Sequence, residues 1–220
     1  MIKAVEVKNI SKKFGSRIIF ENISFSILQG EFVALVGPSG CGKSTLLNMI
    51  GALETYDKGK IMIYGKRMPK IESREAAYLR RNTINYLFQS SALIAEMTVS
   101  QNLYLAMNFV DCSRREKLGQ IEEVLQKVNL LPLKDAKVNT LSGGEQQRVA
   151  LARTLVKPGD LVLADEPTGA LDSVSADNSF ELLRNLSGKY NKTVIMVTHS
   201  TIMAERAERI IDMEELKGKR

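Results

Sequence analysis

The residues best suited to chemistry in this sequence form a glycine-rich segment that could hold a phosphate group. Directly after the apolar run Phe32–Val36, the chain matches the pattern G-x-x-x-x-G-K-[ST]. The residues of the match and its continuation are Gly37, Pro38, Ser39, Gly40, Cys41, Gly42, Lys43, Ser44 and Thr45. Glycines let backbone N–H groups turn inward, and a helix predicted over 43–50 directs its positive end at the same point. We expect Lys43 to bind the β and γ phosphates of a nucleotide and the Ser44 hydroxyl to ligate Mg²⁺.

A structural alternative for this segment is a glycine-rich turn that only joins a strand to a helix. Such a turn does not require the pair Lys43-Ser44, so the order of strand, loop and helix favours phosphate binding. For Cys41 we expect no redox role, because it fills a variable position of the loop.

Two adjacent carboxylates follow a second apolar run, Leu161–Ala164. Asp165 and Glu166 stand at its carboxyl end, where open α/β sheets gather their ligands. We expect Asp165 to hold Mg²⁺ through a water molecule and Glu166 to polarise the water that attacks the γ phosphate. By itself the pair could equally be a solvated acidic turn before Pro167. Its combination with the glycine-rich segment favours a catalytic role.

Two further apolar runs end in polar side chains. The run 84–88 ends at Gln89, and the run 194–197 ends at Thr198 and His199. A lone Gln or His is more often structural, but the carboxyl ends of parallel strands meet at one edge of a sheet. We therefore expect Gln89 to offer its carbonyl oxygen to Mg²⁺ or to the attacking water. His199 is expected to hydrogen-bond the γ phosphate.

A second pair of glycines stands at another predicted helix start. The residues concerned are Ser142, Gly143, Gly144, Glu145 and Gln146, and the helix runs to about residue 156. Ser142 and Glu145 form a capping box, which would start a helix without any ligand. However, two glycines inside a helix cost about 1 kcal/mol each relative to alanine, which makes sense if a phosphate approaches the backbone there. One nucleotide bridging both glycine-rich sites predicts a head-to-tail dimer.

The composition is that of an ordinary globular protein. The chain has 220 residues, of which 44% are apolar and 25% charged, and this excludes a disordered or fibrous chain. Its net charge is +6, but the basic residues are scattered, so we expect no nucleic-acid binding. Two distant cysteines exclude a disulfide framework and a zinc site. Since no apolar run is long enough to span a bilayer and the first residues do not form a signal peptide, we expect a cytoplasmic protein.

The apolar periodicity predicts an α/β fold with a mostly parallel sheet at its core. The four continuous apolar runs alternate with amphipathic helices, for example over 113–130 and 173–186. Alternating strands over 2–7 and 18–28 predict an N-terminal antiparallel β layer. The spacing of residues from about 90 to 158 is almost wholly helical. This pattern predicts one domain over 1–220 with an α-helical subdomain inserted at about 90–158.

Taken together, these motifs resemble the ATP-binding subunits of ABC transporters over essentially the whole chain. The loop at 37–45 resembles the Walker A motif of a P-loop (RecA-like) fold, and 161–166 resembles Walker B with its catalytic glutamate. The segment 141–146 is similar to the signature motif, which separates this family from other P-loop proteins.

Four shorter segments extend the resemblance. Gln89 resembles the Q-loop glutamine, and His199 resembles the switch histidine. Ala170-Leu171-Asp172 is similar to the D-loop, and Phe14 stands where an aromatic ring stacks on adenine in this family. Glu145 departs from the glutamine that many relatives carry in the signature. The catalytic set implied by the resemblance is Lys43, Gln89, Glu166 and His199.

The resemblance also implies partners. Two copies of the chain would close on two MgATP, with the signature of each facing the γ phosphate held by the other. Hydrolysis would reopen the pair and move a membrane permease docked in a groove near the Q-loop. The segment 91–105 supplies Leu93, Ile94, Met97, Val99 and Leu103 for that groove. For at least half of these residues, the core of the helical subdomain is the alternative.

The residues around the motifs, such as 164–172 and 196–199, are similar to one branch of the family. That branch contains macrolide-exporter (MacB-type), lipoprotein-release (LolD-type), cell-division (FtsE-type) and antimicrobial-peptide export ATPases. It implies a permease with an extracytoplasmic domain, export or envelope-directed transport of a peptide, lipid or drug, and a periplasmic or extracytoplasmic adaptor as a further partner. The chain would lie on the inner face of the cell membrane. Because the chain ends soon after His199, we expect no regulatory domain of the sugar-importer type.

An alternative function stays open at this point. A stand-alone ABC ATPase that acts in assembly or nucleic-acid processes, without a permease, would share these motifs. A GTPase is disfavoured because Asn191-Lys192-Thr193 is followed by Val194, where guanine recognition needs a carboxylate.

Overall fold

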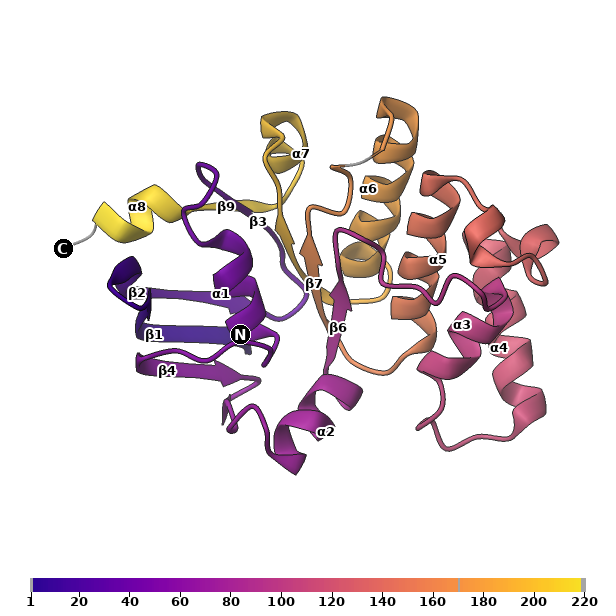
Figure 1. The fold of residues 1–220 in the computed structure, drawn as a ribbon, viewed down its shortest axis with the longest axis horizontal. Coiled ribbons are helices and arrows are strands. Elements are labelled where there is room, and N and C mark those ends of the chain that lie inside the picture. The colour runs from indigo at the N-terminus through magenta and orange to yellow at the C-terminus, as the bar shows by residue number, and fades with distance from the viewer. Residues whose placement is uncertain (1, 170, 219–220) are drawn as a thin grey trace.

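A five-stranded parallel sheet lies at the centre of the molecule (Figure 1). The computed structural model describes residues 2–169 and 171–218. The strand order is β6-β7-β8-β3-β9, and all neighbouring strands run parallel. The strands are β3 (Phe32–Val36), β6 (Ile84–Leu87), β7 (Leu161–Asp165), β8 (Thr193–Val197) and β9 (Arg209–Asp212). The four strands predicted from apolar runs are confirmed, whereas the edge strand β9 is not predicted by the periodicity.

A second, antiparallel sheet contains the N-terminal residues. Its order is β2-β1-β4-β5, with strands β1 (Lys3–Phe14), β2 (Arg17–Leu28), β4 (Lys58–Ile63) and β5 (Lys66–Arg67). The predicted β layer is therefore confirmed, but β1 continues beyond residue 7 through several register shifts. β4 begins with Lys58-Gly59-Lys60, which lacks the alternation that would predict a strand from sequence.

Eight α-helices surround the sheets in the described part of the chain. They are α1 (Lys43–Ile50), α2 (Arg74–Asn82), α3 (Val99–Ala106), α4 (Arg114–Lys127), α5 (Gly143–Val156), α6 (Ser173–Gly188), α7 (Thr201–Glu205) and α8 (Met213–Gly218). The helices predicted after the glycine-rich loop, at the signature and over 173–186 are confirmed. The helix expected over 113–130 ends earlier, at Lys127, and Leu118 on its expected buried face is 39% exposed.

The alternation of side chains along the parallel strands separates two apolar cores. One face of β3 carries Val33 and Leu35 into a core with α1 and the antiparallel sheet. The other face carries Phe32 and Ala34 into a core with α5, α6 and α7. Because successive side chains of a strand point to opposite faces, the continuous apolar run makes both cores. Helices α1 and α5 therefore lie on opposite faces of the parallel sheet.

A third apolar core lies among α3, α4 and α5. It is centred on Val99, Leu103, Ile121, Leu125 and Val149, all of which are fully buried. The segment 90–158, predicted to be almost wholly helical, does not begin with a helix. Residues 88–98 form turns, with positive φ angles of 56° at Ser91 and 47° at Ala92. A backbone held in this left-handed region cannot continue a right-handed helix.

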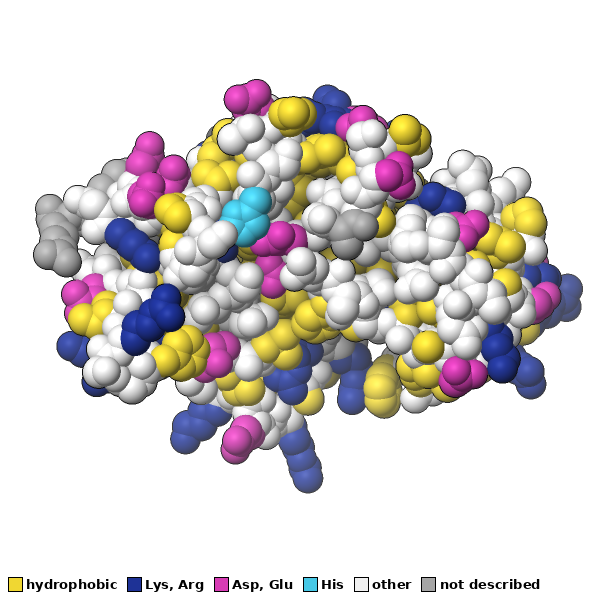
Figure 2. Space-filling view, turned by 45° about the horizontal axis from the view of Figure 1, so that its top comes forward, with side chains coloured by type: hydrophobic (Ala, Val, Ile, Leu, Met, Phe, Trp, Pro, Cys, Tyr) yellow, Lys and Arg dark blue, Asp and Glu magenta, His cyan; other side chains and the backbone are white. Residues whose placement is uncertain are grey.

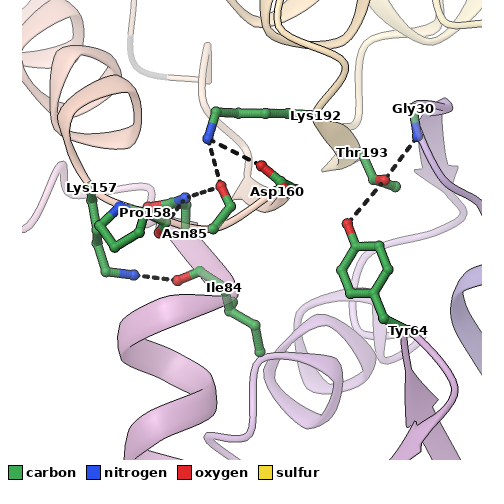
Figure 3. Close-up of polar contacts among 10 residues, drawn as sticks. Gly30, Tyr64, Ile84, Asn85, Lys157, Pro158, Asp160, Lys192 and Thr193 are labelled. Atoms are coloured by element: carbon green, nitrogen blue, oxygen red, sulfur yellow. Dashed lines mark hydrogen bonds and ion pairs between the residues drawn. The ribbon is translucent and has the colours of Figure 1, made fainter.

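The amino ends of the parallel strands are closed by polar contacts (Figure 3). Lys157 donates to the carbonyl of Ile84, and Lys192 to the carbonyl of Gly159. Asn85 Nδ2 donates to the same Gly159 carbonyl at 2.9 Å. Burial lowers the pKa of Lys157 to about 8, but its ammonium group is occupied with backbone carbonyls. These lysines thus satisfy buried carbonyls on the edge opposite the predicted site.

Candidate functional site

Three neighbouring parallel strands deliver the predicted chemical groups to one edge of the sheet. β3 leads into the glycine-rich loop and α1, β7 ends at Asp165, and β8 is followed by His199. Two hydrogen bonds or ion pairs connect the groups across this edge. Ser44 Oγ donates to Asp165 Oδ1 at 3.0 Å, and His199 Nε2 lies 2.7 Å from Glu166 Oε1. The structure therefore brings together residues that are more than 100 positions apart in the sequence.

The glycine-rich loop wraps around the side chain of Lys43. This side chain is buried, and its Nζ donates to the carbonyls of Gly37 at 2.8 Å and Pro38 at 3.0 Å. Gly42, with φ of 102°, precedes α1 and lies tightly against β2. A Cβ atom at this position would be 2.5 Å from Ile19 Cγ2. Only glycine fits such a close approach in the left-handed region, so the loop has the narrow backbone cradle that phosphate binding requires.

The pair of Ser44 and Asp165 provides oxygen ligands of the kind that Mg²⁺ prefers. Ser44 is exposed at the first turn of α1, and its hydroxyl is already directed at the carboxylate. Burial raises the pKa of Asp165, and the neighbouring charge of Glu166 acts in the same direction. A divalent cation bound here would counteract this rise in the pKa of Asp165, because it favours the ionised carboxylate. The residues present thus fit a magnesium ion that arrives with a nucleotide.

Glu166 is held in an uncommon backbone conformation beside His199. Its φ is 47°, and its N–H donates to the Val197 carbonyl at 3.1 Å. The carboxylate is 23% exposed, and the imidazole of His199 is 43% exposed. Figure 2 shows the histidine next to acidic side chains at the surface. A left-handed φ is uncommon for a glutamate, and here it accompanies the contact of a partly buried carboxylate with His199.

The predicted signature forms the start of α5 on the other face of the parallel sheet. Ser142 and Glu145 make the expected capping box, with Ser142 N donating to Glu145 Oε2 at 2.8 Å. This bonding lowers the pKa of Glu145. A Cβ at Gly144 would lie 2.9 Å from Ser175 Oγ, so packing against α6 explains that glycine. At Gly143 the nearest atom would be 4.0 Å away, which leaves its backbone open to an approaching group.

The residue expected in the D-loop lies next to this helix start. Asp172 caps α6, and its Oδ1 accepts a hydrogen bond from Ser175 N at 3.0 Å. Leu171 contacts the position of Gly143, while Ala170 lies outside the described residues. Gln146, also expected in the signature, donates from Nε2 to the Leu141 carbonyl at 3.1 Å.

Gln89 and Phe14, two predicted residues outside the glycine-rich segment and the signature, are both exposed. Gln89 follows β6, so it stands at the same edge of the sheet as Asp165. Phe14 ends β1 with 48% of its surface exposed, and Lys12 Nζ lies 4.5 Å from the centre of its ring. An exposed ring without a core role is available for stacking on a base.

A groove of about 510 Å³ lies between α2, β6 and α3, close to Gln89. Its apolar lining includes Phe88, Leu105 and Phe109, which are 37%, 50% and 63% exposed. None of the five residues predicted for a permease groove lines it. Val99 and Leu103 are instead buried in the core of the helical region, because they occupy the inward face of α3.

The groove is also basic. Arg80, Arg81, Arg153 and Lys157 contribute to its lining, and the lining residues include no carboxylate among those described. Arg153 donates to the carbonyls of Ser91 and Ala92, and the Arg81 guanidinium lies 3.5 Å from the centre of the Phe109 ring. These groove residues come from separate segments of the chain, so sequence spacing alone gives no signal for them.

Two residues of α8 touch the glycine-rich loop and have no counterpart in the sequence-based site. Lys217 Nζ donates to the carbonyl of Cys41 at 2.8 Å, and Met213 is fully buried beside Gly37. The sequence signal for this part of the fold is the apolar pair before the helix, Ile210-Ile211, which could have indicated β9 and the return of the chain to the loop.

Over 2–169 and 171–218, the structure contains no helix with the length and apolar character required to cross a membrane.

Comparison with known sequences matches residues 20–169 to the family model described as "ABC transporter". The chain is 40% identical over 215 residues to the macrolide export ATP-binding/permease protein MacB of Mannheimia succiniciproducens, which covers 96% of this chain. It is 39% identical over 209 residues to the MacB protein of Campylobacter jejuni. The chain spans about a third of the length of these curated relatives, namely 33% and 32%.

Comparison with solved structures extends the similarity over most of the chain. The dimeric structure of MJ0796, a bacterial ABC transporter cassette, is 38% identical with a TM-score of 0.85, covering 94% of this chain and 93% of that one. The fold also matches cbiO1 of Clostridium perfringens, with a TM-score of 0.87 at 24% identity, covering 96% and 85%. The glycine-rich loop at the sheet edge agrees with these matches. Because the family model covers most of the chain and the identity to these relatives is high, this chain belongs to the ATP-binding family of ABC transporters.

Proposed function

We propose that this chain binds MgATP at the carboxyl edge of its parallel sheet and hydrolyses it to drive a membrane permease. The observation that carries this proposal is the pair of contacts across the edge, Ser44 to Asp165 at 3.0 Å and His199 to Glu166 at 2.7 Å. They join the loop that suits phosphate, the oxygen ligands that suit Mg²⁺ and a carboxylate that suits water activation. A relative that is 38% identical to this chain, the cassette MJ0796, has been solved in a post-hydrolysis state with ADP and phosphate.

In this proposal each group of the edge has its own role. The loop N–H groups and Lys43 bind the β and γ phosphates, and Phe14 stacks on adenine. Ser44, Gln89 and Asp165, the last through water, hold Mg²⁺, which when bound draws charge from the phosphates. Glu166 accepts a hydrogen bond from the attacking water and increases its nucleophilicity. His199, paired with that carboxylate, orients it and binds the γ phosphate.

We also propose that the working unit is a head-to-tail dimer around two MgATP. Within one chain, the signature at α5 and the loop before α1 lie on opposite faces of the parallel sheet. The backbone of Gly143 is open on its outer side, and Ser142 is exposed. A second copy therefore supplies the signature that faces each γ phosphate. The dimeric structures of a cassette 38% identical to this chain support that arrangement.

Mixed dimers test this geometry. We expect the variants Lys43→Ala and Ser142→Ala/Gly143→Asp to be inactive alone, because each damages both sites of its own dimer. Random mixing gives dimers with one intact composite site, and ATPase activity should recover to about a quarter of wild type if the two sites act independently. The measurement is phosphate release after mixing differently tagged copies.

The matched control mixes Lys43→Ala with Glu166→Gln. These lesions fall in the same half of the site, so every mixed dimer keeps a defect in both sites. Equal activity in the test and control mixtures, with mixed dimers demonstrated by pull-down of both tags, would contradict the head-to-tail geometry.

We propose that the permease docks in the basic apolar groove beside Gln89. Exposed apolar side chains gathered in one concave patch are typical of protein interaction sites, and Phe109 and Leu105 are at least half exposed. Basic side chains are visible along the side of the molecule on which α2 lies (Figure 2). The permease would be a separate membrane protein of the MacB type with an extracytoplasmic domain, and an adaptor outside the membrane would be a third component. The chain would thus sit on the inner face of the membrane, and the helical subdomain that we assign to about 90–158 would form one wall of the groove.

If the permease docks in this groove, a groove variant should bind MgATP normally but co-purify poorly with a membrane protein. In the variant Leu105→Asp/Phe109→Asp, we expect MgATP affinity to match wild type, because both side chains lie on the groove and away from the phosphate loop. Recovery of the tagged chain with a membrane protein from detergent-solubilised membranes should fall about tenfold or more, since a central apolar contact is lost. Ile2→Asp, which also changes a 64% exposed apolar residue but lies outside the groove, is the matched control. Unchanged recovery of the double variant would exclude this docking surface, and absence of any membrane partner for wild type would favour a stand-alone ATPase.

A further inference from the structure

The short helix α8 makes a direct contact with the phosphate loop that the proposed catalytic roles do not use. Lys217, on the last turn of α8, donates from Nζ to the backbone carbonyl of Cys41 at 2.8 Å. The lysine is half-buried, and the two residues are 176 positions apart. Lys217 does not compete with Lys43, because the Nζ of Lys43 donates to two other carbonyls of the loop, those of Gly37 and Pro38.

The geometry of the peptide bond connects this contact to phosphate binding. The carbonyl of Cys41 and the N–H of Gly42 belong to one planar trans peptide, so they point in opposite directions. A donor that holds the carbonyl therefore also fixes the direction of the Gly42 N–H. Gly42 is the N-cap of α1, and its N–H is one of the donors that the helix itself cannot use. Such N–H groups are those that bind an anion at a helix start.

The rest of α8 supports the same part of the loop. Met213 at its start is fully buried, and a Cβ at Gly37 would lie 3.2 Å from Met213 Cβ. Leu216 packs against the core cluster that contains Leu46 and Leu47 of α1. α8 is thus fixed at both ends relative to α1, which leaves the Lys217 ammonium group at a defined position under the loop. A glycine-rich loop needs such external contacts, because its own residues restrict the backbone least.

We propose that Lys217 is a positioning residue for nucleotide binding: by holding the Cys41 carbonyl outward, it keeps the Gly42 N–H directed at the phosphates. This inference rests on the proposed function, since it assumes that MgATP binds in the loop. Lys217 touches neither the nucleotide nor the reacting atoms. It acts on the affinity of the loop for phosphates and leaves the chemical step to the groups at the sheet edge.

The test compares wild type with Lys217→Met, Lys217→Arg and the control Lys60→Met, an exposed lysine on β4. Titration calorimetry gives the Kd for MgATP and for ADP, and steady-state assays give kcat and KM. For Lys217→Met we expect the Kd for both nucleotides and the KM to rise about three- to tenfold, the size of one ordinary net hydrogen bond, because the lysine acts on the phosphates only through the backbone. We expect kcat at saturating MgATP to match wild type, and Lys217→Arg, which keeps a cationic donor, to recover most of the affinity.

The outcomes separate positioning from simple structural support. If Lys217→Met lowers only the melting temperature and binds both nucleotides with the wild-type Kd, α8 is a structural brace and the inference is overturned. A fall in kcat with unchanged Kd would overturn it as well, because the lysine would then act on the chemical step. If wild type itself fails to bind MgATP while remaining folded, the proposed function fails first, so the two failures are distinguishable.

Discussion

Replacing Glu166 by glutamine is expected to reduce the rate of ATP hydrolysis by about two to four orders of magnitude, the usual contribution of a general base. Glutamine has nearly the same shape, but its amide cannot accept a proton from the attacking water. In the wild type Glu166 lies 2.7 Å from His199, and it is not among the groups proposed to bind the phosphates or Mg²⁺. MgATP binding should therefore persist, and the unhydrolysed nucleotide should keep two copies associated.

Two measurements check this expectation. Phosphate release gives turnover, and sedimentation velocity with and without MgATP gives the fraction of dimer. Glu205→Gln, which changes an exposed carboxylate on α7 just beyond His199, is the matched control and should behave as wild type. A Glu166→Gln variant with wild-type turnover would remove Glu166 as the base.

The second large effect is expected at Lys43. Its substitution by alanine removes the cation enclosed by the phosphate loop, and turnover should fall about 10²- to 10³-fold, as for the loss of one preorganised donor to developing charge. Binding should weaken strongly at the same time, because ground-state phosphates lose the same partner. The variant thus differs from Glu166→Gln, which binds MgATP but does not turn it over.

The internal bonds of Lys43 require a second variant. Because Nζ also donates to the Gly37 and Pro38 carbonyls, Lys43→Ala could distort the nucleotide-free loop. Lys43→Met keeps the apolar stem and removes the charge, so it should show the same loss of affinity by calorimetry. Lys60→Ala on β4 serves as the control for a lysine without a role at the loop. Wild-type affinity and turnover in both Lys43 variants would refute the phosphate-loop assignment.

The parallel sheet and its chemical edge were predictable because their signals are local and strong. The run 32–36 is apolar on both faces, and the glycine-rich loop follows it without a gap, so strand, loop and helix are all indicated within 20 residues. Capping boxes at Ser113 and Ser142 likewise depend on residues only three positions apart, and both are present. The contact of Ser44 with Asp165 follows from the rule that parallel strands bring their carboxyl ends together.

Features that depend on tertiary packing could not be predicted in this way. Helix α2 fully buries only Ala76, so its sequence has few apolar residues to mark it as part of the fold. The groove residues Phe109 and Arg153 come from different elements and meet only in the folded chain. The contact of Lys217 with the loop spans most of the chain length and involves a backbone carbonyl, which no residue type encodes. The resemblance to a family predicted the site residues but did not predict these supporting contacts.

Helix α5 has a mechanical consequence for the way that two distant surfaces communicate. The predicted signature stands at its start, and near its other end Arg153 and Lys157 line the groove. Fourteen residues make a rod of about 21 Å, and its sides are fixed in two apolar cores, with Ala150 in one and Val149 in the other. A rod held in this way transmits a push instead of absorbing it by bending. Any tilt imposed where the helix starts must therefore reappear, after about four turns, as a displacement of the arginine and lysine at its far end.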